Sequence, residues 1–137
     1  MNHFYFHHYN LWAVLVSALI QWVLGALWYS LLFAKPWMAA VGHTPGEKPK
    51  GAAVAMVSSF IGGIILSFAL ARMLLWAHAG SWRWGAVIGG ICWLGFIAVP
   101  LFSQHLYEKR PCKLFVINAG YWLVALLISG VVLAVWR

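Results

Sequence analysis

The sequence predicts an all-α integral membrane protein, a single domain over residues 1–137 in which four transmembrane helices form a compact bundle. Hydrophobic residues make up 64% of the chain and charged residues 8%, whereas soluble domains average roughly 45–50% and 25%. The mean hydropathy is +0.86. The apolar residues fall into four segments, 11–33, 52–76, 84–107 and 114–136, and each reaches the roughly 20 residues that a helix needs to cross a bilayer.

The first segment is expected to stay in the protein as a membrane helix rather than to be removed as a signal peptide. Its leader, MNHFYFHHYN, contains no Lys or Arg, and the apolar stretch exceeds the roughly 7–15 residues of a signal peptide. Near the end of this helix the stretch GALWYSLLFAKPW places Trp28, Tyr29 and Ser30 just before a basic loop at residues 34–51.

The second and third segments each contain one residue that is unusual in a membrane helix. Arg72 is the only strong charge within a span, and it lies one helical turn before Trp76, so its side chain is expected to extend to the membrane surface. Pro100 removes a backbone donor and predicts a kink just before Ser103 and Gln104. That kink would either open a small polar cavity or serve only helix packing.

The glycines of the spans permit close helix contact, but no GxxxG pattern defines a dimer face, and patterns of small residues are common by chance. The nearest patterns run from Ala86 to Gly90 in the third segment and from Ser58 to Gly62 in the second.

The chain is rich in tryptophan, with 10 Trp residues. Those at the helix ends are expected to anchor the protein in the headgroup region. The deeper ones are expected to pack between helices, where each indole N–H needs a partner. These deeper residues are Trp22, Trp28, Trp93 and Trp122.

The cationic residues predict the orientation of the bundle. The loops 34–51 and 108–113 share one side and hold six Lys or Arg residues, whereas the other side has Arg83 and Arg137, with Arg72 near the end of the second helix. The positive-inside rule therefore places both termini on the outer, periplasmic side of a bacterial inner membrane. The net charge of +7 indicates this topology and contact with anionic lipid headgroups, not nucleic-acid binding.

Polar side chains from all four helices are predicted to lie in the inner half of the membrane. A polar group in lipid needs a partner on another helix, so these groups are expected to face one another. Asn118 and Tyr121 share a face of the fourth helix, as Gln21, Gly25 and Trp28 do in the first. The candidate ligand-binding residues are Trp28, Tyr29, Ser30, Gln104, Asn118 and Tyr121. The cluster is either structural hydrogen bonding between helices or the wall of a ligand or ion pocket.

Histidines supply one further candidate site, and the acidic residues exclude several reaction classes. His3, His7, His8 and His78 lie on the predicted outer side and form a candidate copper or zinc site.

The chain has no Asp, and its two Glu residues lie in loops, which argues against paired-carboxylate chemistry, Ser-His-Asp triads and proton-coupled transport through buried acids. No phosphate-binding or dinucleotide-binding motif is present. Because the acids and motifs that these reactions require are missing, we predict that the protein is not an enzyme and carries no cofactor.

Two motifs resemble those of a known family. The first is GALWYS followed by F-x-K-x-W, and the second is INAGYW within RPCKLFVINAGYWLV. They are similar to motifs of the small bacterial membrane proteins of domain of unknown function family 1761, over nearly the whole chain. The resemblance implies a four-helix membrane protein with no assigned reaction and supplies no catalytic residue. The His- and aromatic-rich leader departs from the family pattern.

Two classes of function follow from the sequence. The first is a small protein, acting as a homo-oligomer, that binds or transports an apolar or amphipathic ligand through the polar-aromatic cluster. The second is a non-catalytic accessory subunit of a larger membrane complex, in which the cluster only holds the bundle together. Metal binding by the leader is a third and minor interpretation.

Overall fold

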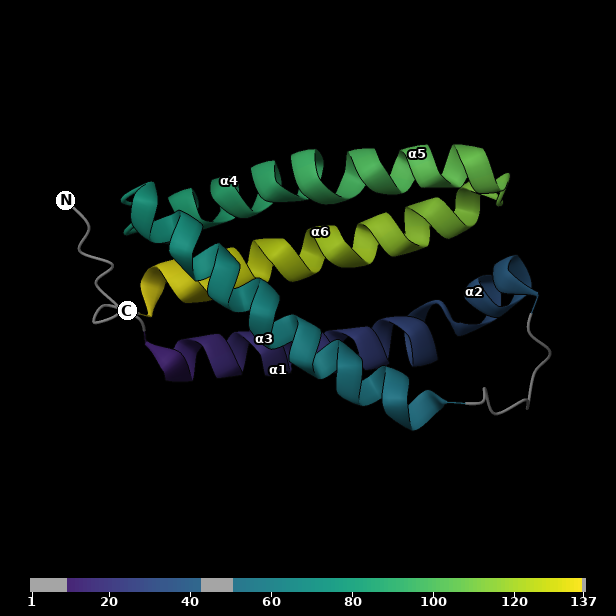
Figure 1. The fold of residues 1–137 in the computed structure, drawn as a ribbon, viewed down its shortest axis with the longest axis horizontal. Coiled ribbons are helices and arrows are strands. Elements are labelled where there is room, and N and C mark those ends of the chain that lie inside the picture. The colour runs from purple at the N-terminus through teal and green to yellow at the C-terminus, as the bar shows by residue number, and fades with distance from the viewer. Residues whose placement is uncertain (1–9, 43–50, 137) are drawn as a thin grey trace.

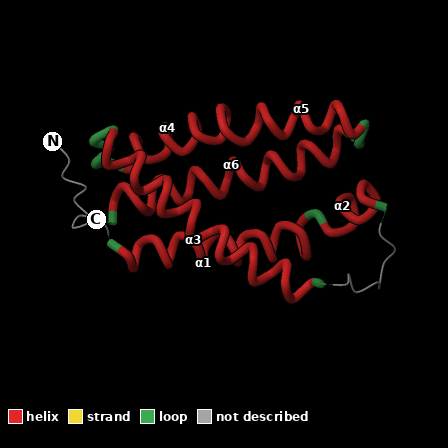
Figure 2. The backbone as a smooth tube through the Cα atoms, in the orientation of Figure 1, coloured by secondary structure: helices red, strands yellow, loops and turns green. Residues whose placement is uncertain are grey.

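The computed structural model describes residues 10–42 and 51–136, and every regular element within these ranges is helical (Figures 1 and 2). Four helices are long and apolar enough to cross a membrane: Leu11–Leu32, Ala52–Trp76, Trp82–Glu108 and Cys112–Val135. The predicted all-α class with four membrane-capable helices is therefore confirmed. Two of these helices are composite, because each contains a segment of π-helix.

The elements follow one another as two antiparallel hairpins. The first hairpin consists of α1 (Leu11–Leu27), the π-helical η2 (Trp28–Leu32), the short α2 (Ala34–Val41) and α3 (Ala52–Trp76). The second consists of α4 (Trp82–Cys92), the π-helical η3 (Trp93–Ala98), α5 (Val99–Glu108) and α6 (Cys112–Val135). Figure 1 shows α6 running between α4–α5 and α1, while α3 crosses α1.

Helix α6 is the centre of the packing. It contacts α1, α2, α3, α4 and α5, and it contributes more buried residues than any other helix. The apolar core joins residues of α1, α3, α4 and α6 around Leu74, Leu126 and Leu133. Every span therefore depends on contacts with the last helix of the chain.

The closest helix contact is made by glycines of α4 and α6. Gly85 and Gly89, four residues apart, are buried against the backbone of Gly130 and Leu126. This is the close backbone approach that small residues permit between membrane helices. The contact therefore uses Gly85 and Gly89, one residue before the Ala86–Gly90 pattern.

The other pattern of small residues, from Ser58 to Gly62, forms no close helix contact. Both residues are exposed, and a Cβ added at Gly62 would meet no heavy atom within 4 Å. The start of α3 diverges from the bundle, and residues 51–59 are all exposed.

Part of the predicted basic loop is helical. The chain turns at Phe33, and Ala34–Val41 forms α2, which packs against α6. The helix ends at Gly42, whose φ of +80° lies in the left-handed region that favours glycine. Figure 1 shows α2 and the α5–α6 turn at the same end of the molecule, opposite the α3–α4 turn. The cations Lys35, Arg110 and Lys113 consequently share that end, and which side of the membrane it faces stays a prediction.

The kink expected at Pro100 takes the form of π-helix. Pro100 lacks the N–H that would bond to the carbonyl of Phe96 in an α-helix. The turn before it widens instead, and Val99 N–H donates to the carbonyl of Leu94, five residues earlier. In the first hairpin Phe33 N–H donates to the carbonyl of Trp28 at 2.9 Å with the same spacing. Such π segments frequently mark functional sites.

Three of the deep tryptophans donate to a backbone carbonyl on another helix, as expected of indoles between helices. Trp28 Nε1 donates to the carbonyl of Ile117 at 3.0 Å, and Trp93 Nε1 donates to that of Ala119 at 2.8 Å. Each of these tryptophans begins a π segment. Trp22 Nε1 donates to the carbonyl of Met56 at 3.1 Å. Both π segments are thus tied to neighbouring positions of α6.

Replacing Trp28 or Trp93 with Phe is expected to lower the free energy of unfolding, and Trp122→Phe is the matched control. All three changes remove similar volume from half-buried sites, but only Trp28 and Trp93 lose a hydrogen bond within the described residues. Interhelical bonds of this kind contribute about 0.6 kcal/mol on average and up to about 1.7. Unfolding by SDS in mixed micelles measures the difference, and equal losses in all three variants would contradict the assignment.

Candidate functional site

Four of the six predicted site residues meet at the interface of η2 with α6. Tyr29 Oη donates to Asn118 Oδ1 at 2.7 Å. The ring of Tyr121 lies 5.6 Å from that of Tyr29 and 6.4 Å from that of Trp28, measured between ring centroids. The edge of Trp28 covers Gly120, where an added Cβ would lie 3.3 Å from the indole. This aromatic cluster is filled and hydrogen-bonded.

Ser30 and Gln104 are not part of this cluster. Ser30 is exposed, because residues two apart on a helix point to different faces and Trp28 points inward. Gln104 is exposed on α5, and its Nε2 donates to Glu108 Oε1 at 3.0 Å. The sequence therefore placed both residues at the correct end of their helices but on the wrong face for the aromatic cluster.

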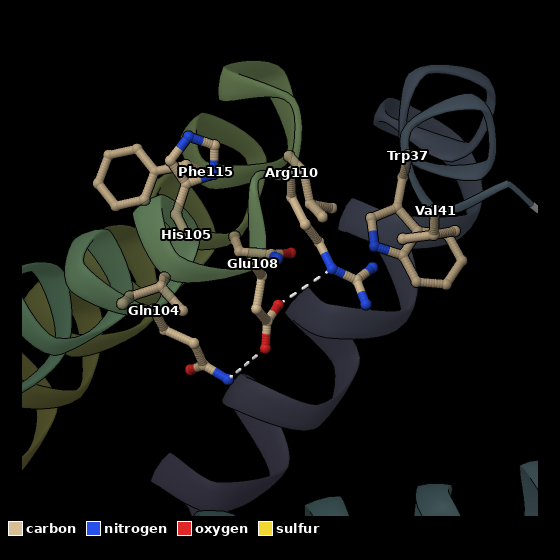
Figure 3. A pocket seen from close by; sticks show the side chains of 10 residues that line it. Trp37, Val41, Gln104, His105, Glu108, Arg110 and Phe115 are labelled. Atoms are coloured by element: carbon tan, nitrogen blue, oxygen red, sulfur yellow. Dashed lines mark hydrogen bonds and ion pairs between the residues drawn. The ribbon is translucent and has the colours of Figure 1, made fainter.

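A cavity of about 260 Å³ lies beside the aromatic cluster, between α2, α5 and α6. Val41, Glu108 and Arg110 are among its lining residues, so it lies at the end of the molecule that holds the basic loops (Figure 3). Asn118 and Trp37 connect the two features, because both line the cavity while Asn118 bonds to Tyr29 and the ring of Trp37 lies 5.6 Å from that of Tyr29. The lining consists of Trp37, Val41, Leu101, Gln104, His105, Glu108, Arg110, Leu114, Phe115 and Asn118.

The walls of this cavity differ in chemistry. Trp37 and Val41 of α2 line one side, and Phe115 of α6 lies on the opposite side beside His105 (Figure 3). The charged wall is formed around Glu108, which accepts from Gln104 and from Arg110 Nε, each at 3.0 Å. The last residue of α5, Glu108, and Arg110 of the following basic turn thus form an ion pair in the cavity lining. The sequence placed Gln104 and Asn118 in the site. It missed Arg110, which was assigned only to topology, and Glu108, which served only to argue against carboxylate chemistry and transport through buried acids.

Sequence reasoning also missed a buried polar network near the middle of the bundle. Gln21 Nε2 donates to Ser67 Oγ at 2.9 Å and to Ser129 Oγ at 3.0 Å, and Ser67 Oγ donates to Ser17 Oγ at 3.0 Å. All four side chains are at most 2% exposed. Gln21 Oε1 is buried without a hydrogen-bond partner among the described residues. The network joins α1, α3 and α6 and leaves one acceptor unsatisfied.

The buried network is linked to the aromatic cluster through Tyr121. Its hydroxyl donates to the backbone carbonyl of Gln21 at 2.9 Å. An added Cβ at Gly25 would lie 3.2 Å from that hydroxyl, so the face of α1 shared by Gln21, Gly25 and Trp28 does point into the bundle as expected. The spacing of Ser17 four residues before Gln21 was the signal that could have extended this face.

The predicted metal site lies mostly outside the described residues. His3, His7 and His8 fall in residues 1–9, and His78 is exposed in the turn between α3 and α4. Within 10–42 and 51–136 no group of three or more His, Cys, Asp or Glu side chains is placed to hold a metal ion. His105 Nε2 lies 3.7 Å from Cys112 Sγ, which makes a pair of possible ligands and not a group of three.

Comparisons with known proteins agree with the resemblance found in the sequence. The family model described as "Protein of unknown function (DUF1761)" matches residues 12–134. The chain is also 35% identical over 60 residues to a protein of Arabidopsis thaliana named "Probable sulfate transporter 3.3". That similarity covers 44% of this chain and 9% of the plant protein, so the chain spans about a tenth of its length. No solved structure matches the chain.

Proposed function

The chain belongs to the DUF1761 family of proteins of unknown function, and we propose that it binds or transports a small apolar or amphipathic ligand in the cavity between α2, α5 and α6. The observation that carries the proposal is the position of this cavity, which is open at one end of the bundle and touches the aromatic cluster at Asn118 and Trp37. Ligand pockets typically combine apolar walls with a few convergent polar groups. The protein holds its ligand without transforming it.

The cavity volume limits the ligand. Pockets for drug-sized ligands enclose roughly 300–1,000 Å³, and this cavity has about 260 Å³. It therefore suits a small molecule or one end of a longer amphiphile. In the proposed orientation the cavity opens toward the cytoplasmic face of a bacterial inner membrane, since the positive-inside rule places the basic loops there.

Transport rather than binding alone draws support from the similarity to the probable sulfate transporter. Only 9% of that protein is covered, so the similarity bears on the class of function and not on the substrate.

Filling the cavity is expected to abolish ligand retention. Leu101→Trp adds an indole to a residue that lines the cavity, whereas Leu106→Trp adds the same group to an exposed position of α5. Native mass spectrometry of the detergent-purified protein is expected to show a small-molecule adduct on the wild type and on Leu106→Trp, and none on Leu101→Trp. A bare wild-type spectrum, or an adduct that persists in Leu101→Trp, would overturn the proposal.

A second candidate, assembly with a further membrane chain, is favoured by the exposed start of α3. Residues 51–59 diverge from the bundle (Figure 1), and the side chain of Ser58 makes no hydrogen bond to any described residue. A polar side chain in lipid is stabilised by a partner helix. The same mass spectra report subunit number, and a monomer that lacks any co-purified chain would count against this candidate.

A further inference from the structure

The charged wall of the cavity contains donors that the protein does not saturate. Both carboxylate oxygens of Glu108 accept hydrogen bonds, one from Gln104 and one from Arg110 Nε. A guanidinium has five N–H donors, and this contact uses the single donor on Nε. No described residue accepts from the two Nη groups. Arg110 is therefore held in place by Glu108 while most of its donors stay available.

The guanidinium is positioned inside the cavity mouth. Figure 3 shows it extending from Glu108 toward Trp37 on the opposite wall. Arg110 and Trp37 both line the cavity. A group that enters between them meets the free edge of the guanidinium on one side and an aromatic ring on the other.

The surroundings of Arg110 are positively charged. Lys35 of α2, Lys109 and Lys113 lie at the same end of the molecule, where Glu108 is the sole acidic residue within the described part of the chain. Helix α6 also begins there, at Cys112, with no acidic residue in its first turn and no side-chain cap. The partial positive charge of a helix N-terminus adds to that of the cations. The potential at this mouth consequently favours an anion.

Beyond the charged mouth the lining is apolar. Leu101, Leu114 and Phe115 line the cavity together with Trp37 and Val41. A ligand that binds both the cationic mouth and the apolar lining residues needs one acidic group and an apolar portion.

We propose that the ligand of this cavity is an acidic amphiphile, whose carboxylate or phosphate group binds Arg110 in place of Glu108 and whose apolar part packs against Trp37 and Phe115. This inference rests on the proposed function and adds the chemical class of the ligand. Guanidinium groups bind carboxylates and phosphates through two parallel hydrogen bonds, which gives geometric specificity. Glu108 then acts as an internal competitor that occupies the guanidinium when the ligand is absent.

The exchange is energetically feasible because the Glu108–Arg110 pair is exposed. The side chains are 43% and 48% exposed, respectively, and exposed ion pairs contribute little to stability. When the pair opens, Glu108 keeps its bond to Gln104 and gains water. A ligand acid loses part of its own hydration, and two hydrogen bonds to Arg110 replace it.

The test compares two probes with the same chain, decanoate and decanol, on the full-length protein in a nonionic detergent. Native mass spectrometry across a concentration series gives the affinity of each probe. Wild-type protein is expected to bind decanoate about ten-fold more tightly than decanol, the ratio that one charge-assisted contact supplies. Arg110→Gln is expected to remove that preference, and Glu108→Gln to strengthen decanoate binding several-fold. Arg83→Gln removes the same charge from the opposite end and is expected to leave both affinities unchanged.

The outcomes separate this inference from the proposed function. Equal binding of decanoate and decanol, both lost in Leu101→Trp, overturns the acidic class and keeps the ligand cavity. Binding of neither probe in wild type, or binding unaffected by Leu101→Trp, overturns the cavity itself. A Glu108→Gln variant that binds decanoate no better than wild type overturns the competitor role of Glu108.

The species that co-purifies with the protein identifies the source of the acid. A retained mass that matches an anionic phospholipid assigns the headgroup to the membrane, and one that matches a free fatty acid assigns it to a soluble amphiphile. Both results support the acidic class. A retained neutral or zwitterionic species, carried in the cavity and lost in Leu101→Trp, contradicts it.

Discussion

Replacing Gly85 or Gly89 with Ala is expected to separate α4 from α6 and to destabilise the fold by about 1–3 kcal/mol or more. A Cβ at Gly85 would overlap the carbonyl oxygen of Gly130 and lie 2.7 Å from the Cβ of Ala134. A Cβ at Gly89 would overlap the carbonyl oxygen of Leu126. Backbone atoms of a helix cannot rotate out of the way as a flexible side chain can, so the two helices must move apart.

The matched controls are Gly90→Ala on the same helix and Gly62→Ala on α3. An added Cβ at Gly90 would lie 3.8 Å from the Leu127 side chain, and one at Gly62 would meet nothing within 4 Å. Alanine also has the higher helix propensity, so the controls are expected to be neutral or slightly stabilising. Unfolding by SDS in mixed micelles measures all four variants. Midpoints for Gly85→Ala and Gly89→Ala that match those of the controls would show that α4 and α6 are not in direct backbone contact.

The membrane-capable helices were predictable because each is determined by the length and apolar composition of its own segment. Each span needs only enough consecutive apolar residues to cross the bilayer, and no knowledge of its neighbours. Short helix α2 was not predictable in this way. Its eight residues are stabilised by packing against α6, and that contact depends on where the chain turns at Phe33.

The contact face of α4 was missed because the sequence offers two overlapping patterns. Gly85 and Gly89 are spaced by four, and so are Ala86 and Gly90. Only the position of Gly130 on the neighbouring helix selects between them. Sequence periodicity gives the spacing of such a contact but not its partner.

The depth of the candidate site residues along their helices was predictable from the sequence, but the directions of their side chains were predictable only in part. Trp28, Tyr29, Asn118 and Tyr121 meet because the two hairpins bring the end of α1 and the start of α6 to the same end of the bundle. Ser30 points away, since residues two apart on a helix point to different faces and Trp28 points inward. Pro100 accounts for the π segment Trp93–Ala98, whereas the segment Trp28–Leu32 contains no proline and has no such signal in the sequence.

The buried network around Gln21 was the hardest feature to predict, because its serines are isolated in apolar helices. Ser67 and Ser129 lie far apart in the chain. They can be recognised as one network only in the structure, where Gln21 donates to both hydroxyls. One glutamine thereby connects three helices. Such a residue fixes the rotation and depth of each helix relative to the others, in addition to any stability that it supplies.

Gln21→Ala is expected to lower the free energy of unfolding by roughly 2–5 kcal/mol, the range for large-to-small changes at fully buried sites. The side chain is 2% exposed, so its removal leaves a cavity at the junction of α1, α3 and α6. It also removes the donor for the hydroxyls of Ser67 and Ser129. The loss is measured as the shift of the SDS unfolding curve in mixed micelles.

Gln21→Met separates the contribution of volume from that of hydrogen bonding. Methionine keeps the length of the side chain and removes the buried Oε1 that has no partner, while serine hydroxyls in a helix can bond to a carbonyl of their own preceding turn. We therefore expect Gln21→Met to cost less than about 1.5 kcal/mol. A loss as large as that of Gln21→Ala would mean that the amide hydrogen bonds, not the filled volume, hold the three helices together. In that case Ser67→Ala and Ser129→Ala should each reproduce part of the loss, whereas a volume effect would leave both variants close to wild type.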